Sequence, residues 1–185
     1  MIKTLQISEK EAWDLAFNAL VNNNTSEDNA KEVADALISA EFDGQAGHGL
    51  SRIPSYVEQL TAGKVKGAEA PSIMSSKGSV IRIDAKNGFA YPAISLALKE
   101  ITATCKNFGI AAASITRSHH FGQAGRHVEI LANNGLIGLM FGNTPKAIPP
   151  WGGTKALFGT NPIAFSTPRE DEAPLVIDMS LSKVA

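Results

Sequence analysis

Three of the four histidines of this chain lie within ten residues, in the segment 118–127. Imidazoles exchange protons near neutral pH, so this segment is a candidate proton-transfer site. Neighbouring side chains of an extended segment point in opposite directions, so only one of His119 and His120 can face a given site. We choose His120, which lies nearer the following helix. His127 falls inside that helix, and we interpret it as a solvated or capping histidine.

A metal site in the same segment ranks below proton transfer. The three clustered histidines lack the spaced Cys, His or carboxylate partners that make a metal signature. We therefore predict no metal.

The fourth histidine, His48, opens a second pattern, because Arg52 and Tyr56 follow it at intervals of four. If a helix begins by His48, the three side chains project from one face. They would align a proton donor, a planar fork that fits a carboxylate, and a hydroxyl group. The alternative is that Tyr56 faces the core while His48 and Arg52 are ordinary surface residues.

The segment around His120 also has the form of a strand, a glycine-bearing turn and the start of a helix. The first turn of a helix offers free N–H groups and a positive dipole end, which suit a phosphate or carboxylate.

Further along, Asp178-Met179-Ser180 ends an apolar strand, where an acid can hold a ribose hydroxyl or an amide. The alternative is a strand end capped by Asp and Ser. No Gly-x-Gly-x-x-Gly follows a strand, so a Rossmann site is not indicated.

The composition describes a globular protein of 185 residues, with 44% hydrophobic residues and a formal charge of -1. Lysines and arginines are spread along the chain, which argues against a nucleic-acid surface. No apolar run reaches the ~20 residues that span a bilayer, so we expect no membrane role. The single cysteine, Cys105, fits a reducing cytoplasm, and its apolar helical neighbours indicate a small core residue.

Periodicity predicts two kinds of region. Helices are expected from the capping box at Ser8 through residue 21, from residue 25 or 26 through about 38, and over 51–60. Residues 61–79 read as a linker, and we place a boundary near Ala70. We therefore expect a helical substrate-side region over 1–70 and an α/β cofactor-binding domain over 71–185. In the second part, strands at 79–84, 109–115, 136–141, 163–166 and 175–178 alternate with helices at 92–108 and up to residue 133.

Together these motifs resemble the malate/L-lactate dehydrogenase family, which comprises non-Rossmann NAD(P)-dependent reductases of 2-keto and cyclic 2-imino acids. The resemblance covers nearly the whole chain. It rests on motifs that occur in family order: Asp43-Gly44 through His48-Gly49, Arg52, 54–56, Ser118-His119-His120-Phe121-Gly122, 149–153, Gly159-Thr160-Asn161-Pro162 and Asp178-Met179-Ser180.

The resemblance implies an α/β fold with a helical region, a cofactor domain built on a mixed, largely antiparallel sheet, and a homodimer. It implies that His48 is the proton donor, that Arg52 and Tyr56 lie at the substrate, and that His120 is the second catalytic histidine. It also implies NAD or NADP as cofactor, with contacts from His120, Phe121, Gly122, Gln123, Ala124, Asn143, Asp178, Met179 and Ser180. The family's usual Ser-His-Gly is Gly47-His48-Gly49 here, so a relay through that serine hydroxyl is absent.

Three functions follow as expectations. The first is hydride transfer between nicotinamide and a small 2-hydroxy or 2-keto acid such as malate or lactate. The second is reduction of a cyclic imine, piperideine- or pyrroline-2-carboxylate. Because the chain stops about halfway through the usual family length, we also expect it to be truncated, and a third possibility is a non-catalytic assembly protein.

Overall fold

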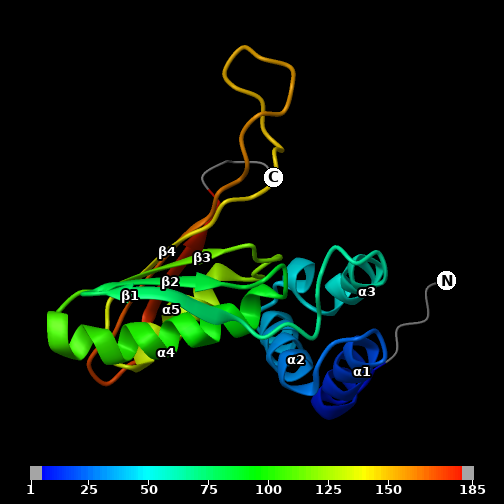
Figure 1. Ribbon diagram of the computed structural model, residues 1–185, viewed down its shortest axis with the longest axis horizontal. Coiled ribbons are helices and arrows are strands. Elements are labelled where there is room, and N and C mark those ends of the chain that lie inside the picture. The colour runs from blue at the N-terminus through cyan, green and yellow to red at the C-terminus, as the bar shows by residue number, and fades with distance from the viewer. Residues whose placement is uncertain (1–5, 181–185) are drawn as a thin grey trace. The chain divides into compact units, whose positions relative to one another are not determined.

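The computed structural model describes residues 6–180, and the chain forms two compact units, residues 1–122 and residues 123–185. The first unit combines several helices with a small sheet and the second combines one helix with another small sheet (Figure 1), which confirms the predicted α/β class. Within the described residues, no helix is long and apolar enough to cross a membrane. The predicted functional division between 1–70 and 71–185 stays a prediction.

The first unit begins with the two helices that the capping signals predict. Helix α1 spans Glu9–Val21, and Ser8 and Glu11 form the reciprocal capping box, in which the Glu11 carboxylate accepts a 2.7 Å hydrogen bond from the Ser8 N–H. Helix α2 spans Glu27–Phe42 and is capped by the Ser26 side chain. A serine oxygen at this position satisfies an N–H group that the first turn leaves without a partner.

Two short 3-10 turns, η1 (Ala46–His48) and η2 (Leu50–Arg52), precede helix α3 (Ile53–Thr61). Gly49 separates the turns, and a Cβ there would lie 2.1 Å from Glu41 Oε1. That same oxygen accepts a 2.7 Å hydrogen bond from the Leu50 N–H. The α-helix therefore begins later than the pattern predicted, because the backbone first turns around the Glu41 carboxylate.

The core of this helical part includes aromatic residues from further along the chain. Phe89 and Tyr91 pack into one buried cluster with residues of the first three helices, among them Leu20, Leu37 and Tyr56. Phe89 is the N-cap of helix α4 (Ala90–Phe108), so the start of α4 is anchored in this cluster. The packing thus brings α3 and the first turn of α4 together, which matters for the site below.

The rest of the first unit is a mixed sheet covered by α4. Strands β1 (Ser72–Lys77) and β2 (Val80–Asp84) are antiparallel, and β2 and β3 (Ala112–Thr116) are parallel. Ile81 and Ile83 of β2 are fully buried beneath Ala93 and Ala97 of α4. Strand β1 lies in the segment expected to be a linker, and that expectation was wrong. Its side chains are mostly exposed, so it lacks the apolar alternation that identifies a half-buried strand.

The second unit is a three-stranded antiparallel sheet with one helix packed on it. Helix α5 (Ala124–Asn133) is followed by β4 (Gly138–Phe141), β5 (Ile163–Thr167) and β6 (Leu175–Met179), in the order β4-β5-β6. The buried Ser166 hydroxyl donates a 2.5 Å hydrogen bond to the Val128 carbonyl and ties β5 to α5. All three strands and the helix lie close to where periodicity predicted them.

Candidate active site

A cluster of histidine and tyrosine side chains lies in the first unit. It is built from η1, the first turns of α3 and α4, and the segment that follows β3. Its members are His48, Tyr56, Tyr91, His119 and His120. The fold therefore brings His48 and His120, which lie 72 positions apart in the sequence, to one place.

The two rings lie nearly parallel. The centroids of His48 and His120 are 5.5 Å apart with an interplanar angle of 10°. His48 does not share a helix face with Arg52 and Tyr56, as the spacing of four suggested, because it belongs to η1 and α3 begins only at Ile53. The break at Gly49, and not helical periodicity, sets the position of His48.

Arg52 lies at the N-cap of α3 and folds back on the preceding turn. Its Nε donates a 2.5 Å hydrogen bond to the Gly47 carbonyl. This contact fixes the plane of the guanidinium group and uses one of its five N–H donors. The two terminal nitrogens form the planar fork that matches a carboxylate.

The Tyr56 hydroxyl is the centre of the cluster. It lies 2.7 Å from His120 Nδ1 and 2.9 Å from the Tyr91 hydroxyl. Tyr56 is 2% exposed, and burial, with Tyr91 as the second cause, raises the pKa of its phenol. Tyr56 is therefore a neutral hydroxyl with both hydrogen-bonding directions occupied.

His120 is uncharged near neutral pH. Burial lowers the pKa of its imidazole to about 3, and electrostatic interactions with Arg52, His48 and His119 act in the same direction. A neutral imidazole accepts a hydrogen bond through one nitrogen and donates through the other, but it is a poor source of a proton. His120 is thus suited to hydrogen-bond a reacting oxygen.

His119 faces the same cluster, contrary to the expectation that the two neighbouring histidines point apart. Its ring meets Tyr56 edge to face at 5.1 Å, and its Nε2 lies 2.9 Å from Gln59 Oε1. The alternation fails because residues 118–122 form no strand. Burial lowers the pKa of His119 to about 4, with Lys64 as the second cause.

These two neutral histidines make the fold sensitive to acid. In the unfolded chain each titrates near 6.5, and in the folded state near 4 and 3, so below pH 6.5 the unfolded state binds more protons. The free energy of unfolding should therefore fall between pH 6.5 and 5, by about 1 kcal/mol for each ring after allowing for partial solvent exposure.

Urea unfolding at several pH values measures this loss. His119→Asn and His120→Asn should each flatten the decline. An unfolding free energy that stays constant from pH 7 to 5 would contradict neutral, buried rings.

In the second unit, Asp178 lies against the start of α5. Its Oδ2 accepts a 2.7 Å hydrogen bond from the Gly125 N–H. The N-cap residue Gln123 makes no side-chain cap of its own. Asp178 therefore acts as an acidic cap for the helix, a contact that neither interpretation of its position at a strand end included.

The other predicted cofactor contacts of this unit lie on loops or at the ends of elements, since Ala124 begins α5 and Met179 ends β6. Asn143 is exposed and lies two residues after the end of β4, and the following Thr144 N–H donates a 3.1 Å hydrogen bond to Asn161 Oδ1. The Ser180 hydroxyl donates a 3.3 Å hydrogen bond to the Thr160 carbonyl. Met179, at the end of β6, is exposed. The Thr144–Asn161 contact thus joins the two ends of the long loop between β4 and β5.

Two further expectations need correction. His127 is neither solvated nor a cap, because it is 3% exposed inside α5. Cys105 is half-buried and is not among the buried core residues. Both expectations failed because the elements packed against a helix decide which of its side chains are buried.

In the described part of the chain, no group of three or more His, Cys, Asp or Glu residues is arranged to hold a metal ion.

Sequence reasoning missed Tyr91, Gln59 and Phe89. Tyr91 lies one residue before the expected helix start, and its hydroxyl contacts Tyr56. A tyrosine inside an apolar run was the available signal, since a buried hydroxyl must find a partner. Gln59 gave no comparable signal, because one glutamine on a helix is usually a surface residue.

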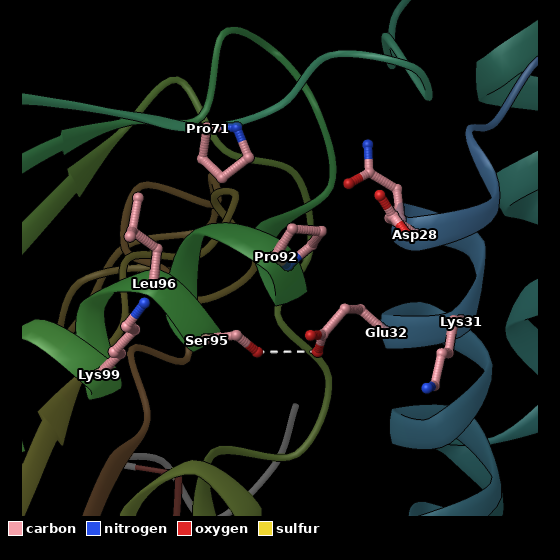
Figure 2. Close-up of a pocket in the computed structure, with 9 residues that line it drawn as sticks. Asp28, Lys31, Glu32, Pro71, Pro92, Ser95, Leu96 and Lys99 are labelled. Atoms are coloured by element: carbon pink, nitrogen blue, oxygen red, sulfur yellow. Dashed lines mark hydrogen bonds between the residues drawn. The ribbon is translucent and has the colours of Figure 1, made fainter.

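A separate shallow depression lies between α2 and α4 (Figure 2). Ser95 Oγ donates a 2.8 Å hydrogen bond to Glu32 across it, and the lysines and acids that line it give no single charge. None of the residues of the histidine and tyrosine cluster line this depression.

The fold and the cluster define an α/β protein with paired imidazoles beside an arginine, an arrangement that suits proton transfer to a carboxylate-bearing molecule. The family model described as malate/L-lactate dehydrogenase matches residues 7–185. The chain therefore belongs to the malate/L-lactate dehydrogenase family.

Its relatives act on different acids. The chain is 50% identical, over 97% of its length and 54% of the relative's, to the (2R)-3-sulfolactate dehydrogenase (NADP(+)) of Chromohalobacter salexigens. It superposes with a TM-score of 0.92 on delta1-piperideine-2-carboxylate reductase from Pseudomonas syringae pv. tomato, at 36% identity, covering 98% of this chain and 55% of that one. Malate dehydrogenase from Entamoeba histolytica gives a TM-score of 0.92 at 26% identity, with coverages of 98% and 50%. The chain spans about half the length of these relatives.

Proposed function

We propose that the protein is an NAD(P)-dependent oxidoreductase that interconverts a small 2-hydroxy acid and the corresponding 2-keto acid. The observation that carries the proposal is the stacked pair of His48 and His120 next to Arg52. The reduction adds a hydride to the keto carbon and a proton to its oxygen. The bound nicotinamide would supply that hydride, and the chain's own residues would bind the acid and provide the proton.

Arg52 would orient the substrate. Its guanidinium group, held through Nε by Gly47, is free to pair its terminal nitrogens with the substrate carboxylate. His48 would give the proton to the developing alkoxide, and would take it back in the oxidation direction. His120, neutral because it is buried, would hydrogen-bond the same oxygen.

The cofactor contacts are proposed for the second unit and for residues 120–122. The N–H groups in the first turn of α5 offer donors, and the exposed Asp178 offers an acceptor for a hydroxyl or an amide. This pairing suits a ribose or a carboxamide better than a phosphate, because the acid already neutralises the helix dipole. Asn143, Met179 and Ser180 complete the proposed contacts.

The identity to a sulfolactate dehydrogenase favours a substrate with a second anionic group and NADP(H) as cofactor. An assay that follows reduced-nicotinamide absorbance with 3-sulfopyruvate, oxaloacetate, pyruvate and delta1-piperideine-2-carboxylate tests this preference. The highest kcat/KM is expected with a dianionic keto acid. Preference for the imine would support the second candidate, a cyclic-imine reductase, which the similarity to the Pseudomonas syringae enzyme favours.

If the chain is instead a non-catalytic assembly protein, it should not bind the nicotinamide cofactor. Titration with NADPH, followed by nicotinamide fluorescence, should show saturable binding if the oxidoreductase proposal holds. No binding at millimolar concentration would favour the assembly protein. We also propose a homodimer, as the family resemblance implies, and a cytoplasmic location, which the single Cys105 fits. Light scattering of the purified protein measures the mass of the assembly.

Arg52→Lys should raise KM for the keto acid by about 10- to 100-fold and change kcat much less. A lysine keeps the charge but loses the planar fork, which costs about one charge-assisted hydrogen bond. Steady-state kinetics measure the two constants separately. Arg82→Lys, at an exposed position on β2, is the matched control and should change neither. An unchanged KM in Arg52→Lys would remove Arg52 from carboxylate binding.

A further inference from the structure

The only two tyrosines of the chain meet beside His120. Tyr91, in the first turn of α4, and Tyr56, in α3, are each 2% exposed, and their hydroxyl oxygens are 2.9 Å apart. The Tyr56 hydroxyl oxygen lies in turn 2.7 Å from His120 Nδ1. Two buried hydroxyls thus lead to one nitrogen of the histidine that the proposed function uses.

The number of available hydrogen atoms leaves two possible arrangements of donors and acceptors along Tyr91, Tyr56 and His120. The Tyr56 hydroxyl has one hydrogen and two neighbours, so it donates to one neighbour and accepts from the other. If it donates to His120 Nδ1, the hydrogen of the neutral imidazole lies on Nε2. If it donates to Tyr91 instead, His120 carries its hydrogen on Nδ1, and Nε2 has a bare lone pair.

The chemistry of the two groups favours the first arrangement. An imidazole nitrogen takes up a proton near pH 6.5, whereas a neutral phenol oxygen is a far weaker base. A phenol O–H donating to an imidazole nitrogen is therefore a stronger contact than an imidazole N–H donating to a phenol oxygen. Tyr56 then accepts from Tyr91, which polarises the Tyr56 O–H further.

We propose that Tyr56 and Tyr91 are positioning residues that hold His120 in the tautomer with its hydrogen on Nε2. This inference rests on the proposed function for its catalytic meaning. It also revises the expectation that Tyr56 lies at the substrate, because both directions of its hydroxyl are engaged within the protein. With Nδ1 occupied by Tyr56, His120 presents an N–H donor on Nε2, as a neutral group that stabilises a developing oxyanion requires.

Nitrogen NMR of the protein labelled with 15N-histidine tests the tautomer without any substrate. The two ring nitrogens of a neutral histidine have well-separated shifts, and the four histidines can be assigned by replacing each in turn. His120 should show a protonated Nε2 and a hydrogen-bonded, unprotonated Nδ1. In Tyr56→Phe the Nδ1 signal should move toward that of a free imidazole or show tautomer exchange. Tyr91→Phe should move it in the same direction by less.

Phe89→Leu is the matched control. Phe89 packs on Tyr56 and His119 without a hydrogen bond to His120, so its variant reports on loosened packing alone. The Nδ1 signal of His120 should stay in place. A hydrogen on Nδ1 in the unmodified protein, or equal shifts in Tyr56→Phe and Phe89→Leu, would overturn the proposal.

Kinetics separate this inference from the proposed function. Tyr56→Phe should lower kcat by roughly 3- to 10-fold, the effect of one hydrogen bond, and leave KM nearly unchanged. Loss of the tautomer signature with unchanged kcat would keep the positioning role and remove His120 from catalysis. An unchanged signature in Tyr56→Phe would refute the positioning role whatever the activity.

Discussion

Replacing His48 by Ala should lower kcat by about 10²–10⁴-fold and leave cofactor binding nearly intact. The expected loss is large because His120, whose pKa is lowered to about 3, is neutral at working pH and makes a poor substitute as proton source. Steady-state kinetics measure kcat, and nicotinamide fluorescence measures the affinity for the cofactor.

Gln45→Ala is the control for His48→Ala, because Gln45 is exposed and precedes the same 3-10 turn. It should turn over like the unmodified protein. Turnover close to that of the unmodified protein in His48→Ala would remove His48 from the mechanism. A fall in cofactor affinity equal to the fall in kcat would indicate a structural role instead.

Gly122→Ala should lower the free energy of unfolding by about 2–4 kcal/mol. Gly122 has φ +67°, and a Cβ there would lie 2.6 Å from the Tyr91 hydroxyl and 3.0 Å from its ring. The positive φ costs an alanine about 1 kcal/mol, and the contact with a buried ring adds about 1–3 kcal/mol of overpacking. Urea unfolding measures the total.

Gly109→Ala separates the two costs. Gly109 has a similar φ of +73°, but a Cβ there would meet nothing within 4 Å. This variant should lose only about 1 kcal/mol. Equal losses at the two positions would show that the Tyr91 ring moves aside without cost, which would also weaken the case that Tyr91 is held firmly against Tyr56.

Local sequence signals determined most of the elements. The capping box at Ser8, the apolar periodicity of α4 and the short apolar run of β5 each depend on residues that are neighbours in the chain. Strand β1 was missed because its stability comes from pairing with β2 and not from burial of its own side chains. Pairing partners are not visible in a single segment.

The types of the residues proposed for catalysis were equally readable from the sequence. The chemistry of their side chains and the family resemblance both indicate His48, Arg52 and His120 as candidate site residues. The reasoning from spacing gave the wrong cause for their arrangement, since it expected one helix face where the structure has a break at Gly49. A close approach to the Glu41 carboxylate produces that break, and Glu41 lies on another element.

Only the tertiary structure determined the hydrogen-bond partners of the site residues and the protonation states of the histidines. The sequence by itself determined an α/β protein of this family and which side chains could carry a proton. The hydrogen bond of Tyr56 to His120, the place of His119 in the cluster, and the neutral state of His119 and His120 depend on which groups the fold packs around them. The reason is physical: burial and hydrogen-bond partners set a pKa and a tautomer, and both arise from contacts between residues that are far apart in the chain.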